Sequence, residues 1–258
     1  MGSTMDHFSM AGKNALVTGA SSGFGAHFSR VLAEAGARVI CAARRKERLD
    51  TVVKEITEAD GAAVAVELDL TSVDSVSRAF DAGEALFGTI DVLVNNAGQI
   101  IFEPFPNIPD ENWERIINTN LSGTFRVSRE FSTRLIQAGR PGAMVTVTSI
   151  TGMLAKNYLA AYGSTKAGLI QLTKQMALDL LPHKIRSNAI APGYFLTEMV
   201  DWYFESPEGK AEIPNLPGGR LGEFHELDGA LLLLASDASS FINGAILPVD
   251  NGHVLRLS

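Results

Sequence analysis

Short apolar segments alternate with segments of helical periodicity along nearly the whole chain, and this alternation limits the possible folds most strongly. The pattern predicts βαβ units on a parallel sheet. The expected strands are 14–18, 38–42, 63–67, 92–95, 144–148, 185–190 and 246–249. The expected helices are 25–35, 46–59, 73–87, 113–137, 160–181 and 226–234. No segment has the composition of a linker, so we expect an N-terminal arm (1–12) and one domain (13–258).

The first expected strand runs into a glycine-rich turn that precedes a helix. The turn reads Thr18-Gly19-Ala20-Ser21-Ser22-Gly23-Phe24-Gly25. Glycines allow close approach of the backbone to a ligand, and a helix N-terminus offers N–H groups and positive potential to a phosphate. The spacing Gly-x-x-x-Gly-x-Gly differs from the Gly-x-Gly-x-x-Gly fingerprint. The turn by itself therefore predicts either a phosphate site or a purely structural turn.

Two arginines follow the second expected strand. An Asp or Glu at this position would bond a ribose 2′-hydroxyl, whereas an Arg accommodates a 2′-phosphate. This chain has Ala43 there, followed by Arg44 and Arg45. The pattern favours NADP(H) over NAD(H). The alternative is that both arginines are solvated charges at the start of a helix.

A serine, a tyrosine and a lysine form the candidate catalytic group. Tyr162 and Lys166 lie four residues apart in a helical segment and so share one face. Ser149 follows the strand expected before that helix. A nearby ammonium favours the phenolate and should lower the Tyr pKa from its usual value of about 10. Such a Tyr can exchange a proton with a carbonyl or alcohol oxygen, and the Ser hydroxyl can hold that oxygen. The alternative is a surface Tyr, a solvated Lys and a turn Ser.

Charge and composition argue against several other classes of function. The chain has 22 Lys and Arg against 29 Asp and Glu, a net charge of −7, so no basic patch suggests nucleic acid. No apolar run approaches the roughly 20 residues that span a bilayer, and no secretory signal is evident. The histidines lack metal-ligand spacing, and a single Cys suits a reducing compartment. We expect a cytoplasmic protein without a metal site.

Together these motifs resemble the short-chain dehydrogenase/reductase family in its standard-length branch, over about residues 13–252. Asn95-Asn96-Ala97-Gly98 and Pro192-Gly193 match further family segments. The resemblance implies a single α/β domain of Rossmann type, with a doubly wound, seven-stranded parallel sheet flanked by helices. It also implies that Ser149, Tyr162, Lys166 and Asn120 are catalytic, with Asn120 holding a water in a proton relay.

The candidate cofactor residues come from these motifs and from the resemblance. They are Thr18, Gly19, Ser21, Ser22, Gly23, Phe24, Gly25, Arg44, Arg45, Asp69, Leu70, Asn96, Ala97, Gly98, Tyr162, Lys166, Pro192, Gly193 and Thr197. Alternatives stay open for several of the polar residues. Asn95 and Asn96 could form a simple polar turn, Asp69 and Thr197 could cap helices, and Asn120 could be a satisfied buried amide.

The longest irregular stretch, about 193–222, is expected to be a substrate lid or a helical hairpin on the sheet edge. The candidate pocket residues are Gln99, Phe102, Met153, Leu154, Leu159, Tyr194, Phe195, Trp202 and Tyr203. This set is mostly apolar, which favours a hydrophobic or aromatic ketone or secondary alcohol.

We therefore predict an NADP(H)-dependent carbonyl reductase or alcohol dehydrogenase, which the resemblance implies to be a homotetramer. One alternative is a 3-oxoacyl-[acyl-carrier-protein] reductase, although only Lys210 and Arg220 stand out near the lid as contacts for an acidic carrier. A dinucleotide-binding regulator is a further alternative, and a regulator would not need Ser149, Tyr162 and Lys166.

Overall fold

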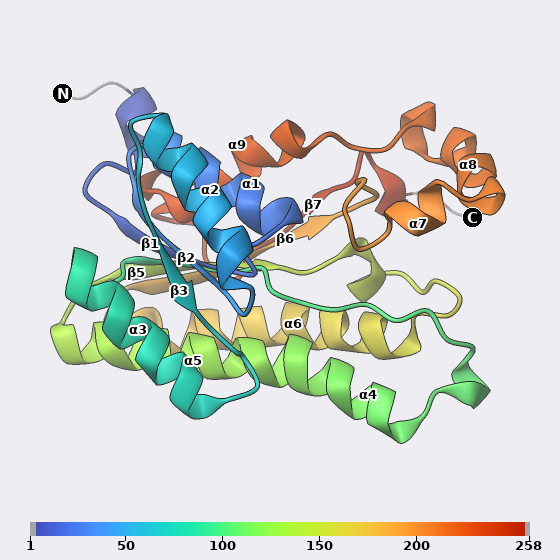
Figure 1. Ribbon diagram of the computed structural model, residues 1–258, viewed down its shortest axis with the longest axis horizontal. Coiled ribbons are helices and arrows are strands. Elements are labelled where there is room, and N and C mark those ends of the chain that lie inside the picture. The colour runs from blue at the N-terminus through green and yellow to red at the C-terminus, as the bar shows by residue number, and fades with distance from the viewer. Residues whose placement is uncertain (1–3, 256–258) are drawn as a thin grey trace.

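The computed structural model describes residues 4–255 and shows a seven-stranded parallel sheet with helices on both faces (Figure 1). The strand order is β3-β2-β1-β4-β5-β6-β7, which confirms the predicted Rossmann-type, doubly wound sheet. The strands are β1 (Asn14–Thr18), β2 (Arg38–Ala43), β3 (Ala62–Glu67), β4 (Val92–Asn95), β5 (Gly142–Val147), β6 (Ile185–Pro192) and β7 (Ile246–Val249). The α-helices are α1 (Gly23–Glu34), α2 (Lys46–Glu58), α3 (Val73–Phe87), α4 (Asp110–Ile116), α5 (Gly123–Ala138), α6 (Ala160–Asp179), α7 (Asp201–Phe204), α8 (Pro207–Glu212) and α9 (Asp228–Ala235).

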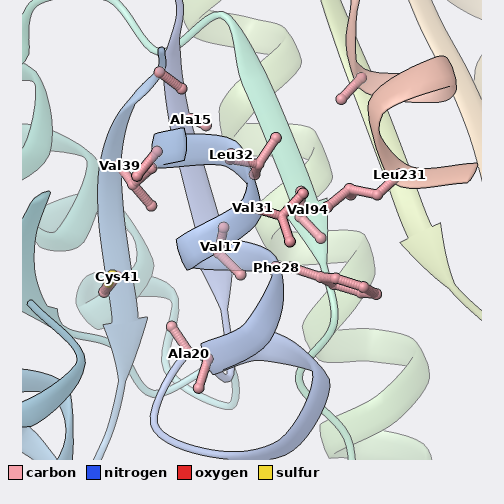
Figure 2. Close-up of a cluster of buried hydrophobic side chains, with 14 of the residues drawn as sticks. Ala15, Val17, Ala20, Phe28, Val31, Leu32, Val39, Cys41, Val94 and Leu231 are labelled. Carbon is pink, nitrogen blue, oxygen red and sulfur yellow. The ribbon is translucent and has the colours of Figure 1, made fainter. Parts of the chain in front are cut away.

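The central strands are apolar on both faces because each face is covered by helices. Successive side chains of a strand point to opposite faces, so Ala15 and Val17 of β1 join one core cluster while Leu16 joins the other. The first cluster packs under α1, α2 and α9, and the second under α3 and α5. Figure 2 shows the first cluster, where Phe28 of α1 lies against the strands. Burial on both sides explains why the strands read as continuous apolar runs.

The strand order places β1 between β2 and β4, so the chain changes direction across the sheet between β3 and β4. In sheets of this kind a crevice forms outside the carboxyl ends of the strands at this switch point. The fold thereby brings the end of β1, which carries the glycine turn, beside the end of β4.

The helix predicted over 113–137 is divided into three parts. Helix α4 is followed by a π-helical segment, Ile117–Ser122, and then by α5. A π turn holds an extra residue within a helix, and such turns are frequent at functional sites. Here the wider turn contains Asn120, whose side chain is fully buried. Periodicity alone did not reveal this interruption, because apolar positions continue on both sides of it.

The arm predicted over residues 1–12 is in part packed against the domain. Thr4–Phe8 form a 3-10 helix. The fully buried side chain of Met10 belongs to the core cluster under α1, and its backbone N–H donates to the carbonyl of Ala35 at 2.8 Å.

The stretch 193–222 is largely helical. It contains α7, α8 and two further 3-10 turns, grouped at one end of the molecule (Figure 1). Its two ends meet, because the N–H of Gly222 donates to the carbonyl of Tyr194 at 2.8 Å. The side chain of Asn251 also donates to the carbonyl of Pro217 at 2.9 Å. Within the described part of the chain, none of the helices combines the length and hydrophobicity of a membrane span.

Replacement of Phe28 by Ala should lower the free energy of unfolding by about 3–5 kcal/mol, because a fully buried ring leaves a cavity in the cluster of Figure 2. Urea unfolding followed by circular dichroism measures the change. The control is Phe105→Ala, at a ring that is 76% exposed, which should change the stability little. Equal effects of the two substitutions would contradict the assignment of this core.

Candidate active site

A cleft of about 630 Å³ lies at the carboxyl ends of β1, β4, β5 and β6. Residues that follow each of these strands line it, among them Gly19, Asn96, Ser149 and Gly193. The cleft therefore occupies the switch point of the sheet, where the fold leads us to expect a ligand.

The ends of β1 and β4 are held together by a set of short hydrogen bonds. The Thr18 hydroxyl accepts from the backbone N–H groups of Asn96 (3.0 Å) and Ala97 (3.1 Å). In return the Asn96 amide donates to the carbonyl of Thr18 at 3.0 Å. Thr18 itself lies behind the cleft lining, whereas Asn96, Ala97 and Gly98 form part of it. The bonds fix the floor of the cleft between the two strands.

The glycine turn wraps around the N-terminus of α1. A side chain at Gly25 would overlap the carbonyl oxygen of Gly19, so only glycine allows the helix to start this close to β1. Ser22, the N-cap of α1, makes no side-chain capping bond. This end of the cleft thus offers backbone N–H groups and the positive end of the helix to an anion.

A guanidinium group extends this anion site. Arg45 donates to the hydroxyls of both Ser21 and Ser22, at 3.0 Å each. Arg44 also lines the cleft, next to Ala43 at the end of β2. The structure therefore brings Arg45 against the glycine turn, although it lies 24 and 23 residues from Ser21 and Ser22 in sequence, and it places Arg44 in the same cleft.

The predicted cofactor residues after β3 are divided, because one lines the cleft and the other lies outside its lining. Leu70 lines the cleft together with Leu68 and Thr71, which the sequence analysis did not select. The Asp69 carboxylate lies outside the lining and accepts from the N–H (2.9 Å) and the hydroxyl (2.7 Å) of Thr71. These bonds from Thr71 hold the pKa of Asp69 below its usual range. Ser72, rather than Asp69, caps α3 by accepting from the N–H of Ser75.

Ser149 lies two residues after the end of β5 and is the N-cap of a short 3-10 turn. Its hydroxyl oxygen accepts from the N–H (3.1 Å) and the hydroxyl (2.9 Å) of Thr151. Because these two donors occupy the oxygen, the hydroxyl hydrogen stays available to a further acceptor. Ser149 can therefore act as a donor in the cleft.

Tyr162 and Lys166 share one face of α6, as predicted, and both line the cleft with Ser149. The ammonium of Lys166 lies 5.4 Å from the centroid of the Tyr162 ring and donates to the carbonyl of Val147 at 2.9 Å. The three candidate catalytic side chains thus meet where β5 ends and α6 begins.

The predicted lowering of the Tyr162 pKa by Lys166 is wrong for this structure. Burial raises the pKa of Tyr162 to about 12, and the hydroxyl of Ser149 only partly opposes the shift. Burial also lowers the pKa of Lys166 to about 8. Both shifts have the same cause, because removal from water disfavours the charged form of each group. Tyr162 consequently holds its proton at neutral pH, and Lys166 titrates close to neutrality.

Asn120 is a saturated buried amide just behind the cleft. Its nitrogen donates to the Gln99 carbonyl (2.8 Å) and the Thr165 hydroxyl (3.2 Å), and its oxygen accepts from the Gln99 N–H (2.8 Å). The side chain therefore ties the chain after Gly98 to helix α6. Protein atoms accept both amide hydrogens of Asn120, so a water could be held only as a donor to an oxygen of this residue. The water relay at Asn120 stays a prediction.

Most of the predicted residues line the same cleft. From the cofactor set these are Gly19, Ser21, Ser22, Gly23, Phe24, Arg44, Arg45, Leu70, Asn96, Ala97, Gly98, Pro192, Gly193 and Thr197, and from the pocket set Gln99, Phe102, Leu159, Tyr194, Phe195 and Tyr203. Met153, Leu154 and Trp202 lie outside the lining and are exposed. The Trp202 ring packs edge-on against Phe102 with centroids 5.2 Å apart, so it supports the rim of the cleft.

Sequence reasoning missed the main polar feature of the substrate end. Lys156 lines the cleft and forms an ion pair with Glu212 of α8 at 2.7 Å. It also donates to the hydroxyl of Tyr194 at 3.0 Å, while Tyr203 donates to Glu212. The pocket is therefore less apolar than predicted. Neither residue lies in a recognisable motif, so no local signal could have identified the pair. Among residues 4–255 no group of three His, Cys, Asp or Glu is placed to hold a metal.

Comparisons with known proteins agree with this geometry. The family model described as short chain dehydrogenase matches residues 13–207. The chain is 38% identical over 255 residues to gluconate 5-dehydrogenase of Gluconobacter oxydans (strain 621H), covering 98% of both chains. It is 35% identical over 246 residues to the 3-oxoacyl-[acyl-carrier-protein] reductase of Thermotoga maritima, covering 95% of this chain and 99% of the relative.

A solved structure shows the same arrangement. The gluconate 5-dehydrogenase from Burkholderia cenocepacia J2315, described in complex with NADP and tartrate, superposes with a TM-score of 0.94 at 34% identity. The match covers 99% of this chain and 100% of that chain.

Proposed function

Since the chain belongs to the short-chain dehydrogenase family, an oxidoreductase family that uses nicotinamide dinucleotides, we propose that it interconverts a ketone and a secondary alcohol with NADP(H). The proposal rests on one observation above all: Ser149, Tyr162 and Lys166 line a cleft that also contains the glycine turn. That cleft combines a proton donor with an anion site, which a dehydrogenase of this kind requires. A dinucleotide-binding regulator would have no use for the proton donor.

The residues at the far end of the cleft fit a phosphorylated dinucleotide. The glycine turn and the uncapped start of α1 would hold the pyrophosphate. Arg45, with Arg44 beside it, would hold a 2′-phosphate, since Ala43 leaves no acidic group at the end of β2. Pro192, Gly193 and Thr197 line the same cleft and would contact the nicotinamide half. When bound, the dinucleotide supplies or accepts the hydride.

The chain's own part in the reaction is to hold the substrate oxygen and move a proton to or from it. Ser149 donates its hydroxyl hydrogen to that oxygen. Tyr162, which stays protonated because burial raises its pKa, gives its proton to the oxygen as negative charge develops there. The Lys166 cation, 5.4 Å from the ring centroid, stabilises the phenolate that remains. Asn120 positions the Gln99 segment, and its proposed relay would restore the proton.

Two observations support a substrate more polar than the hydrophobic or aromatic carbonyl expected from the sequence. The substrate end of the cleft holds the Lys156–Glu212 pair. The similar enzymes of Gluconobacter and Burkholderia are named for gluconate, a hydroxy acid. We therefore propose a hydroxy or keto acid such as gluconate or 5-ketogluconate as the substrate class. The aromatic rings of Phe102 and Tyr203 favour the hydrophobic carbonyl, and the similarity to the Thermotoga enzyme favours an acyl-carrier substrate.

Further parts of the proposal concern the setting of the site. The segment 193–222 would act as the substrate lid, because Tyr194, Phe195 and Tyr203 all reach the cleft from it. The homotetramer and the cytoplasmic location expected from the sequence stay predictions.

Replacement of Tyr162 by Phe should reduce NADPH-dependent turnover by about 100- to 10 000-fold, because the ring keeps its packing but loses the proton donor. The dissociation constant of NADPH, followed by fluorescence, should change less than about twofold. The matched control is Tyr158→Phe, at a ring that is 58% exposed and outside the cleft, which should retain full activity. Turnover of Tyr162→Phe near the wild-type rate would refute the assignment.

Replacement of Arg45 by Ala should raise KM for NADPH by about 10-fold or more, because a charge-assisted bond to the 2′-phosphate is lost. KM for NADH should stay nearly constant. Arg44→Ala should likewise raise KM for NADPH. Steady-state kinetics with both cofactors measure the effect. Lys54→Ala, at an exposed cation further along α2, serves as the control. A wild-type preference for NADH would overturn the cofactor assignment.

The pH dependence of ketone reduction should follow Lys166. Its lowered pKa of about 8 means that the cation is present below that pH and is lost above it, while Tyr162 keeps its proton up to a pKa of about 12. The turnover rate should therefore be level below pH 8 and fall above it. In Lys166→Arg the remaining turnover rate should begin to fall at a higher pH than in the wild type, because the guanidinium stays charged. Initial rates of NADPH oxidation from pH 6 to 10 test this, and a level wild-type profile to pH 10 would contradict it.

A further inference from the structure

The substrate end of the cleft contains an ion pair that joins two distant segments. Lys156 comes from the loop between β5 and α6, and Glu212 ends helix α8 of the stretch 193–222. Their charged atoms are 2.7 Å apart, and the two side chains are 24% and 26% exposed. A pair so enclosed is screened far less by solvent than one on the open surface.

The ammonium of Lys156 is held in one orientation but has a donor to spare. One hydrogen goes to Glu212 and another to the Tyr194 hydroxyl at 3.0 Å. The rings of Tyr194 and Tyr203 lie 4.6 and 5.2 Å from the nitrogen. A lysine ammonium has three hydrogens, and the third has no acceptor within the described residues. Lys156 lines the cleft whereas Glu212 does not, so this third hydrogen is the one that a ligand in the cleft could accept.

Every other charged group of the cleft wall already has a task or a partner. The charged residues that line the cleft are Arg44, Arg45, Lys156, Lys166 and Glu198. Arg45 donates to Ser21 and Ser22 of the glycine turn, and Arg44 interacts electrostatically with Asp69. Lys166 donates to Val147, and Glu198 pairs with Arg48 at 2.7 Å. Lys156 is thus the cation that remains for a substrate.

Lys156 also keeps its charge under ordinary conditions. Partial burial alone would lower the pKa of Lys156, but its hydrogen bonds to Glu212 and Tyr194 outweigh this effect and raise the pKa above its usual value. The ammonium is therefore a fixed positive charge rather than a group that titrates during turnover.

We propose that Lys156 determines specificity for an anionic substrate by binding the carboxylate of a hydroxy or keto acid, and that Glu212 limits the strength of this contact. The inference rests on the proposed function and identifies the substrate-binding group within it. The carboxylate accepts the spare N–H of Lys156. Glu212 competes for the same ammonium and repels the incoming carboxylate, so its presence lowers the affinity for the acid.

A purely structural role for the pair makes a different prediction. If Lys156 and Glu212 served only to fasten α8 to the loop before α6, loss of either partner would loosen the same contact. Both substitutions would then change the kinetics in the same direction, for charged and uncharged substrates alike. Opposite effects of the two substitutions therefore separate recognition from fastening.

The experiment compares Lys156→Met, Lys156→Arg and Glu212→Gln with 5-ketogluconate and with the uncharged ketose D-fructose, at saturating NADPH. Lys156→Met should raise KM for the keto acid by about 10- to 100-fold, because a charged hydrogen bond is lost, with kcat and the ketose KM nearly constant. Lys156→Arg should recover most of the affinity. Glu212→Gln should lower KM for the acid and leave the ketose unchanged. Lys210→Met, at an exposed lysine of the same helix α8, is the control for a lost lid charge.

Calorimetric titration of gluconate into the enzyme–NADP⁺ complex tests the same contact without turnover, and Lys156→Met should weaken binding to the same extent. Equal changes for acid and ketose in Lys156→Met, or the same direction of change in Glu212→Gln, would overturn the inference and leave the proposed function standing. Absence of NADPH oxidation with every carbonyl tested would overturn the proposed function, and the titration would still decide the role of Lys156.

Discussion

A buried ammonium at the carboxyl end of β5 governs the geometry of this site. Lys166 is 4% exposed, and its nitrogen donates to the carbonyl of Val147 at 2.9 Å. Burial of a charge without such a partner is costly, so this contact fixes how α6 lies against the carboxyl end of β5. The approach is close enough that a Cβ at Gly152 would lie 2.7 Å from the backbone of Lys166. With α6 in this position, Tyr162 one turn earlier is brought to the cleft beside Ser149.

The same burial decides the protonation states of the site. It raises the pKa of the phenol and lowers that of the ammonium, because both charged forms lose hydration. In this structure burial, rather than the ammonium 5.4 Å from the ring centroid, sets the direction of the Tyr162 pKa shift. A phenol that keeps its proton is suited to the reduction direction, in which it donates to an oxygen that gains negative charge. The Lys166 cation then acts on the product phenolate rather than on the resting tyrosine.

The two ends of the cleft are built differently. The end with the glycine turn consists of backbone and arginine groups from the first part of the chain. The substrate end is assembled from the loop before α6, the segment after β6 and the two short helices α7 and α8. Aromatic rings form much of its wall, yet an ion pair lies among them. Under the function proposed above, this division would separate the cofactor site from the wall that selects the substrate.

The sequence by itself determined the order and position of the strands, the glycine turn and the shared face of Tyr162 and Lys166. These features depend on periodicity and spacing within one strand, turn or helix, so neighbouring residues are enough to specify them. The π turn at Asn120, the opposite pKa shifts of Tyr162 and Lys166, and the Lys156–Glu212 pair were decided only by the tertiary structure. The partners of that pair are 56 residues apart, and desolvation depends on what the whole fold places around a group. Neither the pairing of residues distant in sequence nor the desolvation of a side chain can be predicted from the local sequence pattern.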